Sequence, residues 1–235
     1  MATIRLIPSA YSLSNTQYLS ISNASNMYTN IDSTTYATVN HGRNRTTSYY
    51  IYIKGFNFDD IPADAIINSA IVKVKAKVKS ASSYAPALYN NTTSLGVNFD
   101  GTIGASDTTS TVDITSNWET YKGYGSNFGI GLQLNRSSLW TASSMNIYGA
   151  EILVDYTIPI HHTISTSITD GVLRSPTTAS ATVRDGANYE ITFNGNPGYT
   201  LSSMTVNGVE VTPTIKSAPA PTLPRYTVST NYGNY

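Results

Sequence analysis

Aromatic side chains in loop-like stretches are the residues of this chain best suited to binding chemistry. Trp118, Tyr121 and Tyr124 fall within the Gly-containing stretch WETYKGYGSN, and Trp140 falls within RSSLWTASS. Aromatic rings can stack on the apolar faces of sugars, while nearby amides and hydroxyls can bond the sugar hydroxyl groups. These four residues therefore form the candidate carbohydrate-binding site. The alternative is that both tryptophans cover the core, because Trp is highly buried on average.

Two groups of residues could hold a metal ion. Asp59 and Asp60 lie between a strand-like stretch and a turn-like Ile-Pro pair, where their carboxylates could supply oxygens to Ca²⁺. Asp also favours turns because its side chain bonds nearby backbone amides, and we favour this interpretation. His161 and His162 are adjacent, so on a strand they would point to opposite faces, and a linker role is favoured over metal binding. We therefore expect no cofactor, with Ca²⁺ at the two aspartates as the alternative.

Catalytic motifs are missing from the sequence. It contains no G-x-S-x-G, H-E-x-x-H, P-loop or dinucleotide-binding pattern and no cysteine. Glycosidases need only two carboxylates, but among 14 acidic residues some pair will always lie close together. The sequence thus predicts a protein without enzymatic activity, and a glycoside-cleaving enzyme is a distant third hypothesis.

Charge and composition exclude further classes of function. The 235 residues carry 14 basic and 14 acidic side chains, and charged residues make up 12% of the chain. An ordinary soluble domain has roughly 25%. A neutral chain lacks the basic surface that nucleic-acid binding needs, and no apolar run approaches the ~18 residues of a membrane span. A surface rich in Tyr, Ser, Thr and Asn instead suits contacts with other proteins or with sugars.

Such a surface is typical of proteins that work outside cells, yet two usual signs of secretion are missing. The N-terminal stretch MATIRLIPSAYSL shows no secretory signal, and the chain has no cysteine to form disulfides. One explanation is a virion protein that assembles in the host cytoplasm and is released by lysis. The alternative location is a bacterial cell surface, reached by another export route.

Strand signals dominate the pattern along the chain. Stretches of alternating β-branched or aromatic residues, separated by polar or Gly/Pro turns, predict an all-β sandwich or barrel. They span residues 17–22, 36–40, 48–58, 70–79, 110–115, 128–135 and 145–158. Residues 116–122 could form one or two helical turns.

The alternation is clearest over 70–79, where valines and Ala76 share one face and Lys73, Lys75, Lys77 and Lys79 share the other. This lysine stripe could attract an acidic glycan or a polynucleotide. We favour a solvated face, or an edge strand protected from aggregation by its lysines.

The first part of the chain resembles β-sandwich domains of the carbohydrate-binding-module and jelly-roll type, found in bacterial surface proteins and phage virion proteins. The resemblance is carried by GFNFDDIPADAIINSAIVKVKAKV (55–78), STVDITSNWETY (110–121) and NFGIGLQL (127–134). It implies a jelly-roll-like sandwich over residues 1–158. In phages such domains often form the body of capsid-decoration, tail-tip or fibre proteins.

The second part resembles the small β-rich bacterial repeat of the divergent internalin B type. The matching stretch is TVRDGANYEITFNGNPGYTLSSMTVNGVEV (182–211). Within it, Asn196-Pro197-Gly198 predicts a turn and Asn207-Gly208 predicts a two-residue hairpin. The resemblance implies a small adhesin-like β module over residues 163–235, of the kind commonly appended to such phage sandwich domains.

Together these observations predict a non-enzymatic phage virion protein, either a capsid decoration or a tail or fibre component, used for assembly and surface adhesion. Its expected partners are other virion proteins and further copies of itself. The alternative function is a carbohydrate-binding adhesin or receptor-binding module, whose partner would be a host surface glycan.

Overall fold

The protein divides into two compact units, Met1–Ile158 and Pro159–Tyr235. The structure, a computed structural model, describes residues 1–42, 48–79, 85–135, 143–168, 172–175, 177–195, 203, 205–206, 209–210, 214–216 and 225–231.

Strands make up most of the first unit, and the all-β prediction is confirmed. The strands are β1 (Ala2–Leu6), β2 (Ala10–Leu13), β3 (Leu19–Ser22), β4 (Ala37–His41), β5 (Tyr49–Lys54), β6 (Ile66–Lys79), β7 (Ala87–Asn90), β8 (Thr93–Asn98), β9 (Thr108–Asp113), β10 (Phe128–Leu134) and β11 (Ser143–Thr157). Between them lie the short helix α1 (Trp118–Lys122) and the 3₁₀ turns Ala24–Met27, Phe58–Asp60, Thr115–Asn117 and Gly125–Asn127.

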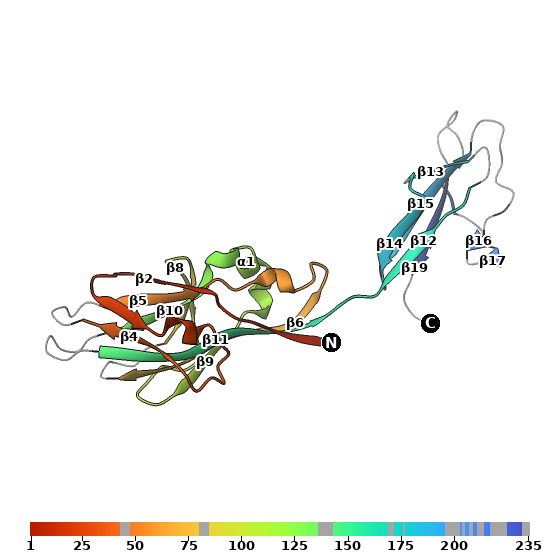
Figure 1. The fold of residues 1–235 in the computed structure, drawn as a ribbon. Helices are drawn as coiled ribbons and strands as arrows, with labels where there is room; N and C mark the ends of the chain where they lie inside the picture. The colour runs from red at the N-terminus through yellow and green to blue at the C-terminus, as the bar shows by residue number, and fades with distance from the viewer. Residues whose placement is uncertain are drawn as a thin grey trace. The chain divides into compact units, whose positions relative to one another are not determined.

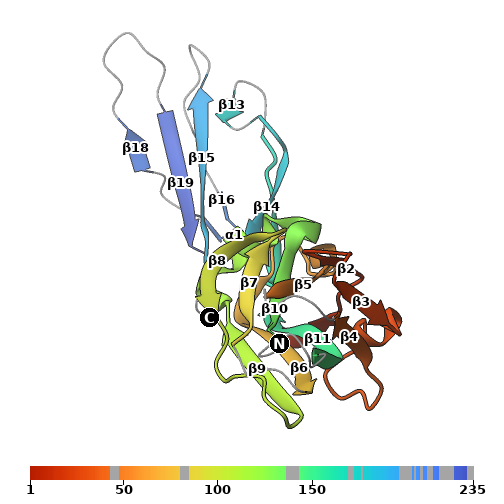
Figure 2. The same ribbon diagram turned by 90° about the vertical axis from the view of Figure 1, so that its left-hand side faces the viewer.

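These strands form two antiparallel sheets that stack as layers (Figure 1). One sheet has the order β3-β4-β11-β6-β9, with β1 as a sixth strand paired to β11; the other has the order β2-β5-β10-β7-β8. Figure 2 shows the strands of each sheet lying side by side in these orders, with one sheet in each layer. From β4 to β11 the chain places β4, β6, β9 and β11 in one sheet and β5, β7, β8 and β10 in the other. This is the connectivity of a jelly roll.

The core lies between the two sheets and follows from the alternation in the sequence. On β6, the side chains of Val72, Val74 and Ala76 are 0% exposed, while the intervening lysines point to the outer face. The opposing sheet contributes Ile53 and Ile130, which are also 0% exposed. Burying one such aliphatic side chain stabilises the fold by roughly 1.5–3 kcal/mol. The two sheets are therefore held together by their inward-facing residues.

Strand β6 lies between β11 and β9. The suggestion that the lysine stripe protects an edge strand is therefore wrong, because hydrogen-bonded neighbours flank this strand on both sides. The stripe instead lies across the outer face of the six-stranded sheet.

A β-bulge in β11 shapes that outer face. The pairing register between β11 and β6 shifts between Ile147 and Gly149. The segment before β4 covers this bulge: Ala150 N donates to Thr29 O at 3.3 Å, and Thr29 Oγ1 donates to Tyr148 O at 3.1 Å. A side chain at Gly149 would overlap the backbone of this segment, so the close approach requires glycine.

The second unit is built from shorter strands. They are β12 (His161–Ser165), β13 (Val172–Ser175), β14 (Ser180–Arg184), β15 (Asn188–Gly195), β16 (Thr205–Val206), β17 (Val209–Glu210), β18 (Thr214–Lys216) and β19 (Arg225–Asn231). They pair as β12-β14, β13-β15-β19-β18 and β16-β17. Its described core consists of Ile164, Val183 and Ile191, with Tyr189 and Phe193 packed beside them.

Two sequence predictions fall in this second unit. The histidines expected in a linker begin strand β12 instead, with His161 and His162 paired to Arg184 and Val183. Strands β16 and β17 pair in the register of a hairpin around Asn207-Gly208. The Asn207-Gly208 and Asn196-Pro197-Gly198 turns themselves lie outside the described residues.

Candidate functional site

Three of the four aromatic residues proposed to bind sugars lie in the core of the first unit or pack against it. Trp118 is 3% exposed and packs edge-on against Phe58, with ring centroids 5.4 Å apart. Tyr121 is 7% exposed and stacks on Phe128 at 5.3 Å. Tyr124 is half-buried against the same core. These rings have little free face to offer a sugar, so the structure favours the core interpretation for them.

Trp140, the fourth residue of that candidate site, lies outside the described residues. The short helix α1 explains why the other three turn inward. A five-residue helix is too short to be stable alone, so it needs an apolar face against the protein. Trp118 and Tyr121, spaced three residues apart, supply that face.

A surface hollow of about 210 Å³ lies beside the start of α1. The residues that line it are Ala65, Ile67, Thr115, Ser116, Asn117, Trp118, Glu119 and Thr120. Ser116, Asn117 and Thr120 are exposed, whereas Ile67 is half-buried and Trp118 is buried. The hollow thus combines an apolar base with a hydroxyl- and amide-bearing rim. The sequence pointed to Trp118 as a candidate binding residue, but it did not point to the polar rim residues Ser116, Asn117 and Thr120.

Asp113 fixes the chain at the entrance to this segment. Its Oδ1 accepts hydrogen bonds from Thr115 N at 2.8 Å and Thr115 Oγ1 at 2.6 Å. The side-chain hydrogen bond from Thr115, followed by the backbone one, lowers the pKa of Asp113 below its usual value. Thr115 Oγ1 also accepts from Ala70 N at 2.9 Å, which ties the turn to β6.

The two aspartates considered for Ca²⁺ lie in the 3₁₀ turn Phe58–Asp60, and both are exposed. Asn57 organises this turn: its Oδ1 accepts from Asp59 N at 3.2 Å, and its Nδ2 donates to Asp60 Oδ1 at 2.9 Å. Such contacts are typical of turn-forming residues. No group of three His, Cys, Asp or Glu side chains suited to a metal ion occurs within the described ranges. A Ca²⁺ site at Asp59 and Asp60 stays a prediction.

A buried carboxylate lies on the outer face of the six-stranded sheet. Glu151, in β11, is 0% exposed, and neither of its oxygens has a hydrogen-bond partner. Two cations lie near it: Arg5 Nη1 is 3.6 Å from Oε2, and Lys73 Nζ is 4.0 Å from Oε1. Arg5 Nη1 also donates to Asp32 Oδ2 at 3.0 Å, which raises the pKa of the guanidinium. The arrangement links β1, β6 and β11.

The next part of the lysine stripe holds an aromatic pair. Lys75 Nζ lies 5.2 Å from the ring centroid of Tyr148, and Tyr36 packs edge-on against that ring at 5.3 Å. Tyr148 donates from its hydroxyl to Asp107 Oδ1 at 3.0 Å, and Lys77 Nζ lies 3.5 Å from the same oxygen. Burial, followed by the bond to Asp107, raises the pKa of Tyr148. We call these five residues the Tyr36 cluster.

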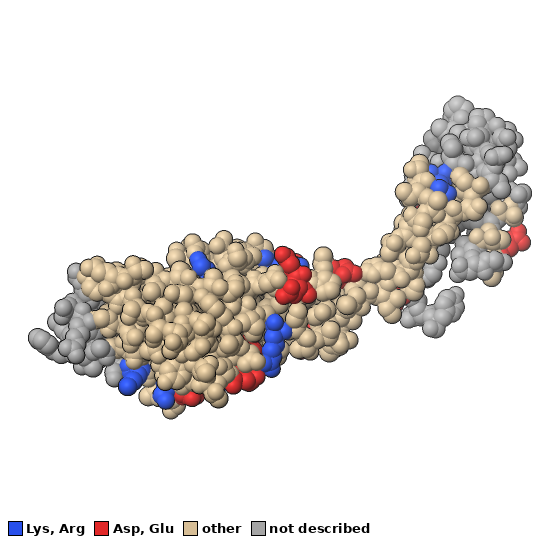
Figure 3. All heavy atoms as spheres, viewed as in Figure 1, with Lys and Arg blue, Asp and Glu red and all other residues tan. Residues whose placement is uncertain are grey.

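Three tyrosines lie on the outer face of the five-stranded sheet. Tyr50 stacks on Tyr52 at 5.9 Å, and Tyr52 meets Tyr89 edge-on at 5.0 Å. The ring of Tyr89 occupies the space that a side chain at Gly131 would need. Burial, followed by the neighbouring tyrosines, raises the pKa of Tyr89 to about 12. Charged side chains are sparse on the face of the first unit shown in Figure 3.

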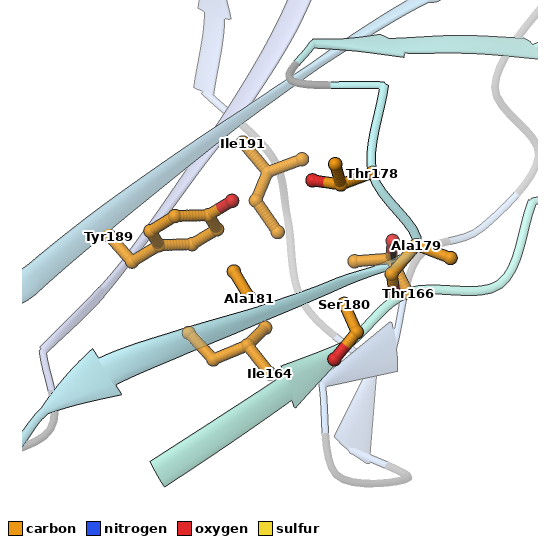
Figure 4. Close-up of a pocket in the computed structure, with 8 residues that line it drawn as sticks. All are labelled: Ile164, Thr166, Thr178, Ala179, Ser180, Ala181, Tyr189 and Ile191. Atoms are coloured by element: carbon orange, nitrogen blue, oxygen red, sulfur yellow. Dashed lines mark hydrogen bonds between the residues drawn. The ribbon is translucent and has the colours of Figure 1, made fainter. Parts of the chain in front are cut away.

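In the second unit, a small gap separates the β12-β14 pair from β15. Figure 4 shows Ile164, Ala181, Tyr189 and Ile191 turned toward one another around it. Its residues belong to the small core or adjoin it. The gap is therefore a packing seam rather than a binding site. Nearby, His162 Nε2 lies 2.9 Å from Asp185 Oδ1.

Comparisons of the chain with protein-family models, with curated proteins and with solved structures find no match. In the part of the chain that the structure describes, no helix is both long enough and apolar enough to cross a membrane. The functional argument therefore depends on the fold and on the sites described above.

Proposed function

We propose that this protein is a non-enzymatic structural component of a bacteriophage virion, either a capsid decoration or a tail or fibre protein. Its jelly-roll unit would contact other virion proteins and further copies of the chain. Such a location fits assembly in the host cytoplasm followed by release at lysis.

One observation carries this proposal: a jelly-roll scaffold whose five-stranded sheet has a tyrosine-bearing outer face. Jelly rolls are a recurrent architecture of viral capsid domains. On the five-stranded sheet, Tyr50 is half-buried and packs on Tyr52 and Tyr89, which are only 6% and 8% exposed, so its ring is held in place before any partner binds. Tyrosine adds contact area with little loss of conformational entropy, so such a face suits repeated protein contacts. The resemblance of residues 55–78 to phage β-sandwich domains supports the same conclusion.

Mass spectrometry of purified phage particles tests this proposal directly. We expect peptides of this chain in particles that have been washed free of lysate, and a symmetric oligomer of the purified protein in light scattering. A strictly monomeric protein that is absent from purified particles would contradict the proposal.

A second candidate function is a carbohydrate-binding adhesin, which the hollow beside α1 favours. Its rim of Ser116, Asn117 and Thr120 offers the hydroxyl and amide groups that bond sugar hydroxyls. Substitution of the core residue Trp118 would unfold the site, so the informative variant is Asn117→Ala. We expect this variant to lose any glycan-array signal due to the hollow, and the exposed Asn98→Ala on β8 to keep it. If both variants gave the same glycan-array signal, the hollow would be ruled out as the glycan-binding site.

A further inference from the structure

Tyr36 presents an aromatic ring that the fold holds in place at the surface. It is 41% exposed, although its ring packs edge-on against Tyr148, which is only 8% exposed. Its backbone is also fixed, because Asn26 Nδ2 donates to Tyr36 O at 3.0 Å. An exposed ring that is already ordered loses little entropy when a ligand stacks on it.

Charged groups flank this ring in a fixed arrangement. Tyr148 donates a hydrogen bond to Asp107, and Asp107 also forms an ion pair with Lys77. The side chains of Lys77 and Asp107 remain 40% and 45% exposed. Lys75 lies over the ring of Tyr148 and has no carboxylate partner among the described contacts. Two lysines and one aspartate leave the cluster with one net positive charge.

Neutral hydrogen-bonding groups continue the surface along the same face of the sheet. Thr38 and Asn146 are paired across β4 and β11, and Asn146 is paired with Lys77 across β11 and β6. Thr38 Oγ1 donates to Asn146 Oδ1 at 3.2 Å. An accessible ring thus adjoins hydroxyl, amide, carboxylate and ammonium groups.

We propose that the Tyr36 cluster binds an acidic saccharide, a sugar residue that carries a carboxylate, phosphate or sulfate group. The ring of Tyr36 stacks on the apolar face of the sugar. Asp107 and Asn146 bond its hydroxyls, and Lys75, the lysine of the cluster without a carboxylate partner among the described contacts, attracts its anionic substituent. The proposal goes beyond virion assembly and is independent of the hollow beside α1.

The ion pairs along the lysine stripe favour an acidic saccharide over a polynucleotide as the ligand. A polynucleotide site needs a run of free cations, because affinity comes mainly from neutralising successive phosphates. Here Lys73 is directed to Glu151, and Lys77 to Asp107. The stripe therefore suits a ligand with one localised negative charge beside a stacking surface.

A glycan array tests the site on the full-length protein. The array displays oligosaccharides that bear uronate, phosphate or sulfate groups, each beside a neutral counterpart, and single-stranded DNA serves as the polynucleotide probe. We expect binding to an acidic saccharide and a reduction of affinity by about tenfold or more in Tyr36→Ala. Tyr36→Phe should keep most of the affinity because it keeps the ring.

The charge requirement is tested by a matched pair of lysine variants. Lys75→Gln should weaken binding, whereas Lys54→Gln, on the opposite sheet, should not. The proposal is overturned if no acidic saccharide binds better than its neutral counterpart, if Tyr36→Ala binds normally, if both lysine variants weaken binding equally, or if DNA binds best. Circular dichroism melts of each variant, matched to the wild type, ensure that lost binding is not lost folding.

Discussion

Gly149 shows how one residue without a side chain shapes a surface. The backbone of Thr29 and Asn30 lies where a Cβ of residue 149 would be. Tyr148, its neighbour in the bulge, is the residue against which Tyr36 packs. The glycine therefore supports both the packing of the covering segment and the geometry of the Tyr36 cluster.

We predict that Gly149→Ala destabilises the first unit by about 1–3 kcal/mol, because backbone rather than a flexible side chain has to move. Urea denaturation measures this change. Gly104→Ala is the matched control, since a Cβ there meets nothing within 4 Å. Equal stability of the two variants would show that the covering segment can shift without loss.

Asp113 makes a pH-dependent contribution. Its pKa is lowered in the folded state by the two hydrogen bonds from Thr115. A lowered pKa means that the stabilisation is complete above the unfolded-state pKa and is lost as pH falls through the folded-state pKa. We predict that Asp113→Asn lowers the free energy of unfolding by up to about 1 kcal/mol at pH 7, because the amide oxygen can accept both hydrogen bonds but without the added strength that a charged acceptor gives.

Urea titrations between pH 7 and pH 2 measure the difference between Asp113→Asn and the wild type. The difference should shrink toward the acidic end. A constant difference for Asp113→Asn would mean that its role is packing rather than charge.

At the scale of single residues, the sequence shows which side chains could take part in binding, but it only partly shows which of them are exposed. The aromatic cluster around Trp118 was visible as a pattern, but its burial depends on Phe58 and Phe128, which come from elsewhere in the chain. Tyr36 is one of 18 tyrosines, and nothing in its local sequence marks it. Its partner Tyr148 is more than a hundred positions away and reaches it through a bulge that local pattern does not reveal.

At the scale of elements, strand alternation was the most informative signal. The Val/Lys alternation predicted a strand over 70–79, and β6 spans Ile66–Lys79. The helical turns predicted over 116–122 correspond to Thr115–Asn117 and α1. In the first unit, the short strands β1, β2, β7 and β8 were missed, because a run of four to six residues is too short for alternation to distinguish it from a loop.

The contact between β1, β6 and β11 at Glu151 leads to an element-scale prediction. A buried carboxylate without hydrogen bonds pays a desolvation penalty that its distant cations offset only in part. We predict that Glu151→Met leaves the free energy of unfolding within about 1 kcal/mol of the wild type, because both cations it releases are partly exposed.

Arg5→Ala should be more harmful than Glu151→Met, because it leaves the carboxylate buried beside a single lysine. Adding Glu151→Met to Arg5→Ala should restore stability. Urea denaturation of the two single variants and the double variant measures this coupling. A double variant as unstable as Arg5→Ala would show that the arginine acts through β1 packing alone.

At the scale of the whole molecule, each unit has a hydrophobic core of its own. The first core draws on both sheets, whereas the second has Ile164, Val183 and Ile191 as its described buried residues. The second unit, Pro159–Tyr235, is about half as long as the first, and a shorter chain buries a smaller fraction of its surface on folding. We predict that the fragment 1–158 unfolds cooperatively by itself, and that the second unit accounts for a weaker, lower-temperature transition of the full chain.

Differential scanning calorimetry of the fragment and the full chain checks this prediction. The main transition should occur at the same temperature in both. A fragment without a cooperative transition would show that the first unit needs residues beyond Ile158.

The jelly-roll connectivity could be expected from the resemblance of residues 55–134, but not from the alternation pattern alone, because strand order depends on pairings that are distant in sequence.

The pairing of β1 with β11 has a consequence for folding. Ala2 lies opposite Tyr156, so the first strand of the unit joins its sheet through the last one. The same last strand also separates β4 from β6. During synthesis, β4 therefore lacks this neighbour until Ser143–Ile147 has emerged from the ribosome, and β6 lacks its full length until Thr157 has emerged. We expect a slow closing step and, before it, a nascent chain in which β4 and β6 each expose one unpaired edge, so that it is prone to aggregation and benefits from chaperones.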